Sequence, residues 1–154
     1  MKNNVNDKLA EILNDLIQIN NDRIEGYERA SKETKDVDAD LRALFSRMGD
    51  ESRQYVSELT AAVTRLGCDP ASDTTARGKI YRAWMDVKAT FTGKDRKAIL
   101  ASCEYGEDAA QDAYDSALEE TELTGDQRDL VTRQKTMLRA SHDLIKRQRD
   151  MQTA

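Results

Sequence analysis

Apolar residues recur at helical spacing in four long segments of the chain. We expect helices over about residues 5–31, 39–66, 94–123 and 124–151. The charged stretch KETKDVDAD separates the first two segments, and Gly67, followed closely by Pro70, ends the second. The sequence TGD at residues 124–126 offers a tight break and a new N-cap before the last segment. The pattern therefore predicts four long amphipathic helices.

The segment between the second and third predicted helices reads CDPASDTTARGKIYRAWMDVKATFTG. Its centre keeps a helical period, carried by Ile80, Tyr81, Trp84, Val87, Lys88 and Phe91. We expect a short extra helix here, which lies against the other helices and buries Trp84, the only tryptophan of the chain.

Helices of this length are stable only when their apolar faces pack together. Two short connections and one long one favour an up-down four-helix bundle with a short extra helix in the crossover between helices two and three. The sequence thus predicts an all-α fold, with residues 1–154 in a single domain. Leu16 and Leu59 are expected in the core. Four tyrosines are expected to fill it as well, each with one polar tip: Tyr27, Tyr55, Tyr105 and Tyr114.

Composition excludes several classes of partner. The chain has 154 residues, a net charge of −5 and 34% charged residues, and its mean hydropathy is −0.78. An acidic chain lacks the basic footprint of a nucleic-acid binder, and it is not attracted to anionic membrane surfaces. Cys68 and Cys103 are far apart in a sequence that begins without a signal-like apolar run. We therefore expect a cytoplasmic protein with free cysteines.

Three features carry a family resemblance. The run GKIYRAWMDVKATFTGKDRKAILASCEYGEDAAQDAYDSAL, the stretch INNDRIEGYERA and the single histidine, His142, are similar to an uncharacterised bacterial family of ferritin-like four-helix-bundle proteins, a domain of unknown function. The resemblance covers nearly the whole chain. It implies a ferritin-like fold, in which a di-iron site takes one Glu from each of two helices and a Glu-x-x-His from each of the other two.

Only part of that ligand set is present. Matching INNDRIEGY to the first ferritin helix puts Asn20, an amide, at the inward ligand position. In the second helix Glu51 lies on or beside the buried stripe, but Gln54 stands three residues later where histidine is needed. Glutamine is a poor substitute, because its carbonyl is a neutral and weak donor.

The other half of the set is equally incomplete. Glu107 is expected to point inward more than its neighbour Glu104, and His142 stands three residues after Arg139 instead of after a glutamate. The only candidate metal ligands are therefore Glu51, Glu107 and His142, and the metal would be iron or manganese. The structural alternative is a satisfied polar layer, in which Glu51 and Glu107 bond to tyrosine hydroxyls or pair with Arg139.

The sequence holds no phosphate loop, nucleophile elbow or HExxH motif, so we expect no catalytic residue, no cofactor-binding residue and no cofactor. We expect a non-enzymatic helical-bundle protein with a degenerate ferritin-type metal site and an interaction role. The resemblance adds a possible association with stress, and homo-oligomers that pair through helix faces. The alternative is a metal-binding ferritin-like oxidase, or a protein that handles iron or manganese, using Glu51, Glu107 and His142.

Overall fold

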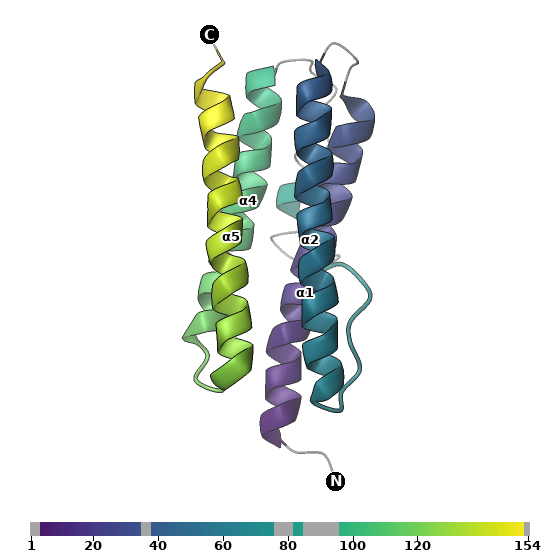
Figure 1. Cartoon of the computed structure of the whole chain (residues 1–154), viewed down its shortest axis with the longest axis vertical. Helices are drawn as coiled ribbons and strands as arrows, with labels where there is room; N and C mark the ends of the chain where they lie inside the picture. Colours follow the sequence, from purple (N-terminus) through teal and green to yellow (C-terminus); the bar gives the residue numbers. More distant parts are fainter. Residues whose placement is uncertain (1–3, 35–37, 76–81, 85–95, 153–154) are drawn as a thin grey trace.

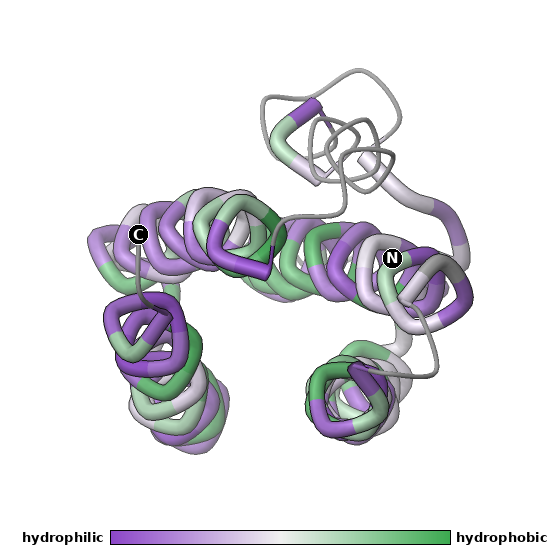
Figure 2. The backbone as a smooth tube through the Cα atoms, turned by 90° about the horizontal axis from the view of Figure 1, so that it is seen from above, coloured by the Kyte–Doolittle hydropathy of each residue, from purple (hydrophilic) through white to green (hydrophobic). Residues whose placement is uncertain are grey.

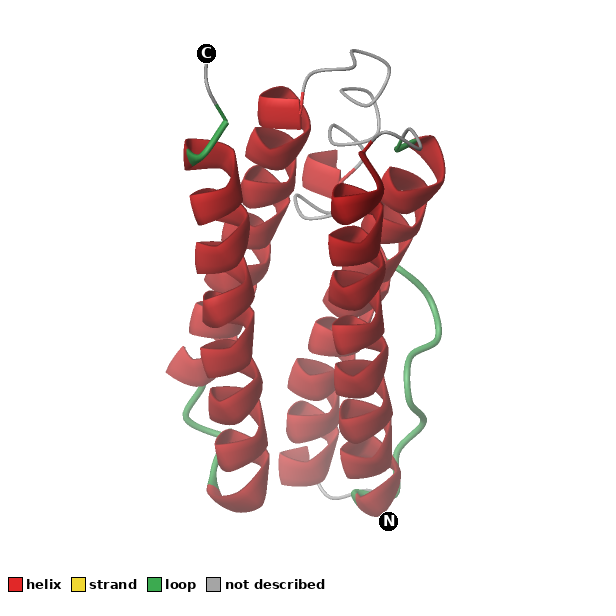
Figure 3. Ribbon diagram, turned by 45° about the horizontal axis from the view of Figure 1, so that its top comes forward, coloured by secondary structure: helices red, strands yellow, loops and turns green. Residues whose placement is uncertain are grey.

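The computed structural model describes residues 4–34, 38–75, 82–84 and 96–152. Four long helices account for most of them: α1 (Asn4–Glu33), α2 (Ala39–Arg65), α4 (Arg96–Glu119) and α5 (Gly125–Asp150). None of these described residues forms a β-strand (Figure 3). The predicted all-α fold is confirmed.

The four helices form a bundle with one long crossover. α1 and α2 are antiparallel neighbours, and so are α4 and α5 (Figure 1). α2 and α4 run in the same direction (Figure 1). Two parallel helices cannot be joined by a tight turn, which is why the connection between α2 and α4 is long.

The predicted helix boundaries agree with the observed ones to within a few residues, and two turns show why. Gly67 follows the end of α2 with φ 79°. The amide of Gly67 bonds to the carbonyl of Thr64, and the amide of Cys68 bonds to that of Val63. This is a Schellman cap, which glycine adopts without strain. At the start of α5, Thr124 is the extended N-cap residue and Gly125 has φ 57°.

The buried apolar residues form two clusters, one toward each end of the bundle. Leu16 and Leu59 lie in the larger cluster, as predicted. Tyr27, Tyr55 and Tyr114 are also buried, but the prediction for Tyr105 is wrong, because this side chain is mostly exposed on the outer face of α4.

Among the described residues of the crossover, Trp84 packs into the bundle. Residues 82–84 are helical and lie on the outer side of the bundle, beside α1 and α4 (Figure 2). Trp84 is completely buried, as predicted, and its ring packs on Tyr27 with 4.9 Å between centroids. The remainder of the predicted extra helix lies outside the described residues.

Two glycines make room for this tryptophan. A Cβ at Gly26 of α1 would lie 2.5 Å from the Trp84 ring, and a Cβ at Gly106 of α4 would lie 2.8 Å from it. Both distances are far below van der Waals contact. Trp84 therefore occupies a space between α1 and α4 that exists only because neither helix has a side chain there.

None of the helices among the described residues is both long and apolar enough to cross a membrane.

Candidate functional site

A layer of buried and partly buried polar side chains separates the two apolar clusters. Every long helix contributes to it at the point where its apolar stripe is interrupted. Its members are Asn20 and Arg23 of α1, Glu51 and Ser52 of α2, Glu107 of α4, and Ser141 of α5. We call these six residues the polar layer.

Arg23 is the centre of the polar layer. Its side chain is 0% exposed, and its Nε donates to Oε1 of Glu107 at 2.9 Å. Its Nη2 lies 3.1 Å from Oε1 of Glu51, while Nη1 donates to Ser52 at 2.8 Å. Burial alone would lower the pKa of Arg23, but the negative charge of Glu107, with smaller contributions from Glu51, raises it above its ordinary value. The guanidinium is therefore a permanent internal cation.

Glu107 is completely buried and has a second strong donor. The hydroxyl of Tyr27 donates to Oε1 of Glu107 at 2.5 Å. Burial, and then the nearby charge of Glu107, raise the pKa of Tyr27 well above its ordinary value. The other carboxylate oxygen, Oε2, has no hydrogen-bond partner among the described residues. Arg23 and Tyr27 thus both bind the same oxygen, Oε1.

A chain of hydrogen bonds runs from this centre to the surface. Ser52 accepts from Arg23 and donates to Asn20 at 2.9 Å. Asn20 donates to the hydroxyl of Tyr114 at 2.8 Å, which in turn donates to Gln134 at 2.7 Å. Gln134 completes the chain by donating to Glu58 at the edge of the bundle. The chain joins all four long helices, so it fixes their relative register.

The structure brings Glu51 and Glu107 together, but their cation is not the one expected. The prediction that Arg139 pairs with these carboxylates is wrong, because its side chain is 65% exposed on α5 and pairs with Asp143. Arg23 takes the role instead. The signal was in the sequence, because Arg23 lies one turn from both Asn20 and Tyr27 on the buried face of α1.

His142 does not join the two core carboxylates. Its Nε2 lies 2.6 Å from Asp108 of α4, and its Nδ1 lies 3.0 Å from Asp143. Glu104, which also lies near this histidine, pairs with Arg149. The three candidate ligands named from the sequence are therefore divided between the polar layer and the α4–α5 surface.

The polar layer does not match the ligand set of a di-iron site. A guanidinium, not a carboxylate, comes from α1 between Glu51 and Glu107. Gln54 and Arg139, at the two other positions tested from the sequence, are exposed. Two divalent ions require several carboxylates to offset their charge, and a fixed guanidinium at their centre repels them. The residues that are present favour an ion-paired layer.

Cys103 lies one turn before Glu107 and is fully buried. Burial, and then the charge of Glu107, raise the pKa of this thiol well above its ordinary value. The reactive form of cysteine is the thiolate, so Cys103 is held in its inert form. Neither Cys103 nor Cys68 forms a disulfide in the part of the chain that the structure describes.

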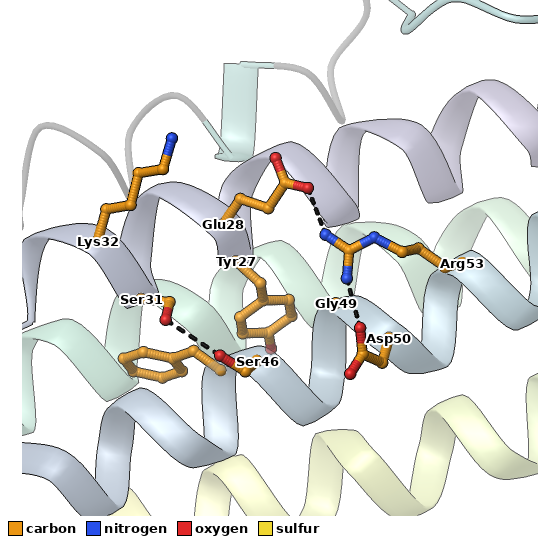
Figure 4. A pocket seen from close by; sticks show the side chains of 9 residues that line it. Tyr27, Glu28, Ser31, Lys32, Ser46, Gly49, Asp50 and Arg53 are labelled. Carbon is orange, nitrogen blue, oxygen red and sulfur yellow. Dashed lines mark hydrogen bonds and ion pairs between the residues drawn. The ribbon is translucent and has the colours of Figure 1, made fainter.

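One surface groove reaches the edge of this region. It has a volume of about 570 Å³, lies between α1 and α2, and has Tyr27 and Phe45 among its lining residues. Figure 4 shows Arg53 at its rim, paired with Glu28 and Asp50. The hydroxyl of Tyr27 is directed inward to Glu107, so the groove meets the side of this tyrosine and not its polar tip.

Comparison with known proteins assigns a family. No curated protein matches the chain. One family model, described as "Domain of unknown function (DUF2383)", matches residues 8–120, which include most of α1, α2, the crossover and α4. This match covers well over half of the chain, so the protein belongs to that family of unknown function.

Proposed function

We propose that this protein is a non-enzymatic helical bundle in which an arginine takes the place that ferritin-like proteins give to metal ions. The observation that carries the proposal is the guanidinium of Arg23, fully buried between the carboxylates of Glu51 and Glu107. It supplies one permanent positive charge without exchange or redox chemistry. The layer is then a structural element, which holds the helices in register.

The ferritin-like relationship is supported by topology. Ferritin-like bundles are distinguished from simple up-down bundles by one long crossover connection. The chain has such a connection between α2 and α4, and these two helices are parallel (Figure 1). The resemblance noted from the sequence points the same way.

Because a guanidinium already fills the internal site, we infer that the protein acts through an interaction at its surface. The exposed apolar side chains include Tyr105 on α4 and Met137 on α5. Both lie on outer helix faces, where a protein partner or a second copy can reach them. The association with stress rests on the family resemblance alone.

Iron uptake and ferrous oxidation test the proposal. Untagged protein, freed of metal by dialysis against a chelator, is mixed with ferrous iron in air. We expect oxidation at the rate of buffer alone, and no iron bound through the core carboxylates. The double variant Glu51→Gln with Glu107→Gln should leave iron uptake unchanged. Two ions per chain, lost in that double variant, would instead establish the alternative, a metal-binding oxidase or an iron- or manganese-handling protein.

A further inference from the structure

We propose that Glu104, Asp108 and His142 form a binding site for a divalent transition-metal ion on the surface between α4 and α5. One ligand atom from each of the three residues lies within 4.8 Å of the others. Glu104 and Asp108 are one turn apart on α4, and His142 comes from the antiparallel neighbour α5 (Figure 1). The site is distinct from the polar layer, whose carboxylates belong to Glu51 and Glu107.

The ligand types fit such an ion. Imidazole and carboxylate groups together suit zinc, iron and manganese, and three protein ligands leave a further position open to water. In a tetrahedral site with bonds of about 2.1 Å the ligand atoms are about 3.4 Å apart. Asp108 and His142, now 2.6 Å apart, have to separate slightly, and the wider pairs, within 4.8 Å, have to approach. Asp108 is 57% exposed and can rotate to accommodate the ion.

The position of His142 provides the first independent argument. Asp108 faces one ring nitrogen at 2.6 Å and Asp143 faces the other at 3.0 Å. A neutral imidazole has one proton for these two acceptors. At 2.6 Å, Nε2 and the Asp108 oxygen share a proton. An ion bound to both groups takes the place of that proton, while Nδ1 donates to Asp143. A carboxylate that orients the outer nitrogen of a ligating histidine is the usual support of a metal site.

A buried amide provides the second argument. Gln111 lies one turn beyond Asp108 on α4 and is 8% exposed. Its Nε2 is buried without a hydrogen-bond partner among the described residues. Buried amide donors are normally satisfied. A water bound to the ion at its open position would be an acceptor of the kind that this donor lacks.

Charge balance favours an ion with two positive charges. Two ion-paired groups meet at the site. One joins His142 with Asp108, Asp143 and Arg139, and the other joins Glu104 with Arg149 and Asp150, which makes four carboxylates and two guanidinium groups. With a neutral histidine the two groups together carry two uncompensated negative charges. Arg149 pairs with one oxygen of Glu104, so it competes with the ion for this ligand.

Zinc binding to the full, untagged chain tests the site. The protein is freed of metal and titrated with Zn²⁺ in a non-chelating buffer at fixed neutral pH, with calorimetry as the readout. We expect one equivalent to bind. Asp108→Asn and His142→Gln should each weaken binding by about tenfold or more, and Asp143→Asn should weaken it by about tenfold. Arg149→Gln should tighten binding, because the competing cation is removed.

Two control variants and one spectroscopic signal complete the test. Asp112→Asn removes an exposed carboxylate one turn from Asp108, and Glu107→Gln alters the polar layer; neither should change zinc affinity. His142 is the only histidine of the chain, so its ring protons are a unique reporter in nuclear magnetic resonance spectra. Those signals should shift with zinc in the wild type and in Asp112→Asn.

Three results would overturn the proposal. The wild type could fail to bind zinc, or zinc affinity could be unchanged in both Asp108→Asn and His142→Gln. The third is that the His142 signals do not shift when zinc is added. Uptake lost in Glu107→Gln but retained in Asp108→Asn would place the metal in the core, which contradicts the proposed function as well. Far-ultraviolet circular dichroism of each variant shows that lost binding is not lost folding.

Discussion

At the residue scale, the choice of Arg23 as the internal cation has physical consequences. A guanidinium is charged at every accessible pH and offers five donors in a fixed plane. Those donors reach Glu107, Glu51, Ser52 and the carbonyl of Met48 at once. A buried ion pair of this kind adds little net stability compared with an apolar core, but losing one partner is costly. The arginine therefore specifies how the helices meet.

The glycines beside Trp84 give a prediction with a control in the same chain. Gly26→Ala and Gly106→Ala should each destabilise the protein by about 1–3 kcal/mol, because the new methyl group overlaps the tryptophan ring. Gly49→Ala, whose Cβ would meet nothing closer than 3.5 Å, should be neutral or stabilising by up to about 1 kcal/mol, since alanine favours helix. Denaturant unfolding measures all three.

Tryptophan emission refines that experiment, because Trp84 is the only source of it. The first two variants should shift the emission toward that of a solvated indole, and Gly49→Ala should not. Equal stability in all three variants would mean that Trp84 does not lie between the two glycines.

At the element scale, the outer face of α1 holds the crossover. Asn14 bonds to the backbone at Asp69 and Ala71, and Asn21 bonds to the carbonyl of Asp73. Asp22 accepts from both the amide and the hydroxyl of Thr75. These polar side chains look like an ordinary solvated face in the sequence. In the structure they bind the segment that carries the chain from α2 toward Trp84.

Asp22 makes this attachment sensitive to pH. Burial raises the pKa of its carboxyl group to about 6, so between about pH 4 and pH 6 the folded state holds a proton that the unfolded state has released. The stabilisation is therefore fully present below about pH 4 and is lost as the pH rises through 6.

Asp22→Asn should remove this contribution to the slope of unfolding free energy against pH, while the amide keeps an acceptor for Thr75. Urea unfolding at several pH values from 4 to 7 provides the comparison with the wild type. An unchanged slope in the variant would show that Asp22 is not the group responsible.

The helices were predictable from the sequence because each signal for them is local. Gly67 has the backbone conformation that ends α2, and the Thr124–Gly125 pair marks the start of α5. The site was only partly predictable. The inward positions of Glu51 and Glu107 follow from helical spacing, but their partner depends on how α1 faces α2 and α4. The prediction that Tyr105 is buried was wrong, because an aromatic side chain alone does not indicate which face of α4 packs against the other helices.

At the scale of the whole molecule, the bundle consists of two helical hairpins. α1 packs closely on α2, and α4 on α5, whereas the contacts between these pairs are fewer. The hydrogen-bond chain from Ser52 through Asn20, Tyr114 and Gln134 crosses from one hairpin to the other. Polar contacts thus tie together two units whose closest packing is internal.

Tyr114 is the link in that chain that can be removed most cleanly. Tyr114→Phe should cost about 1–3 kcal/mol, because it leaves buried groups of Asn20 and Gln134 without their partner. Tyr105→Phe, at an exposed position on the same helix, should change stability by less than about 0.5 kcal/mol. Equal effects in thermal or denaturant unfolding would contradict a connecting role for Tyr114.

The measurement that bears most directly on Arg23 is a double-mutant cycle with Glu107. The stability of each variant is measured by denaturant unfolding at neutral pH in the presence of a chelator. Arg23→Met alone should cost about 3–5 kcal/mol, because it leaves Glu107 buried without its cation. Arg23→Met with Glu107→Gln should cost clearly less than that, because the charge itself is gone. The exposed Arg139→Gln should change stability by less than about 0.5 kcal/mol. Additive effects at positions 23 and 107, or a larger cost at 139 than at 23, would contradict Arg23 as the cation of the core.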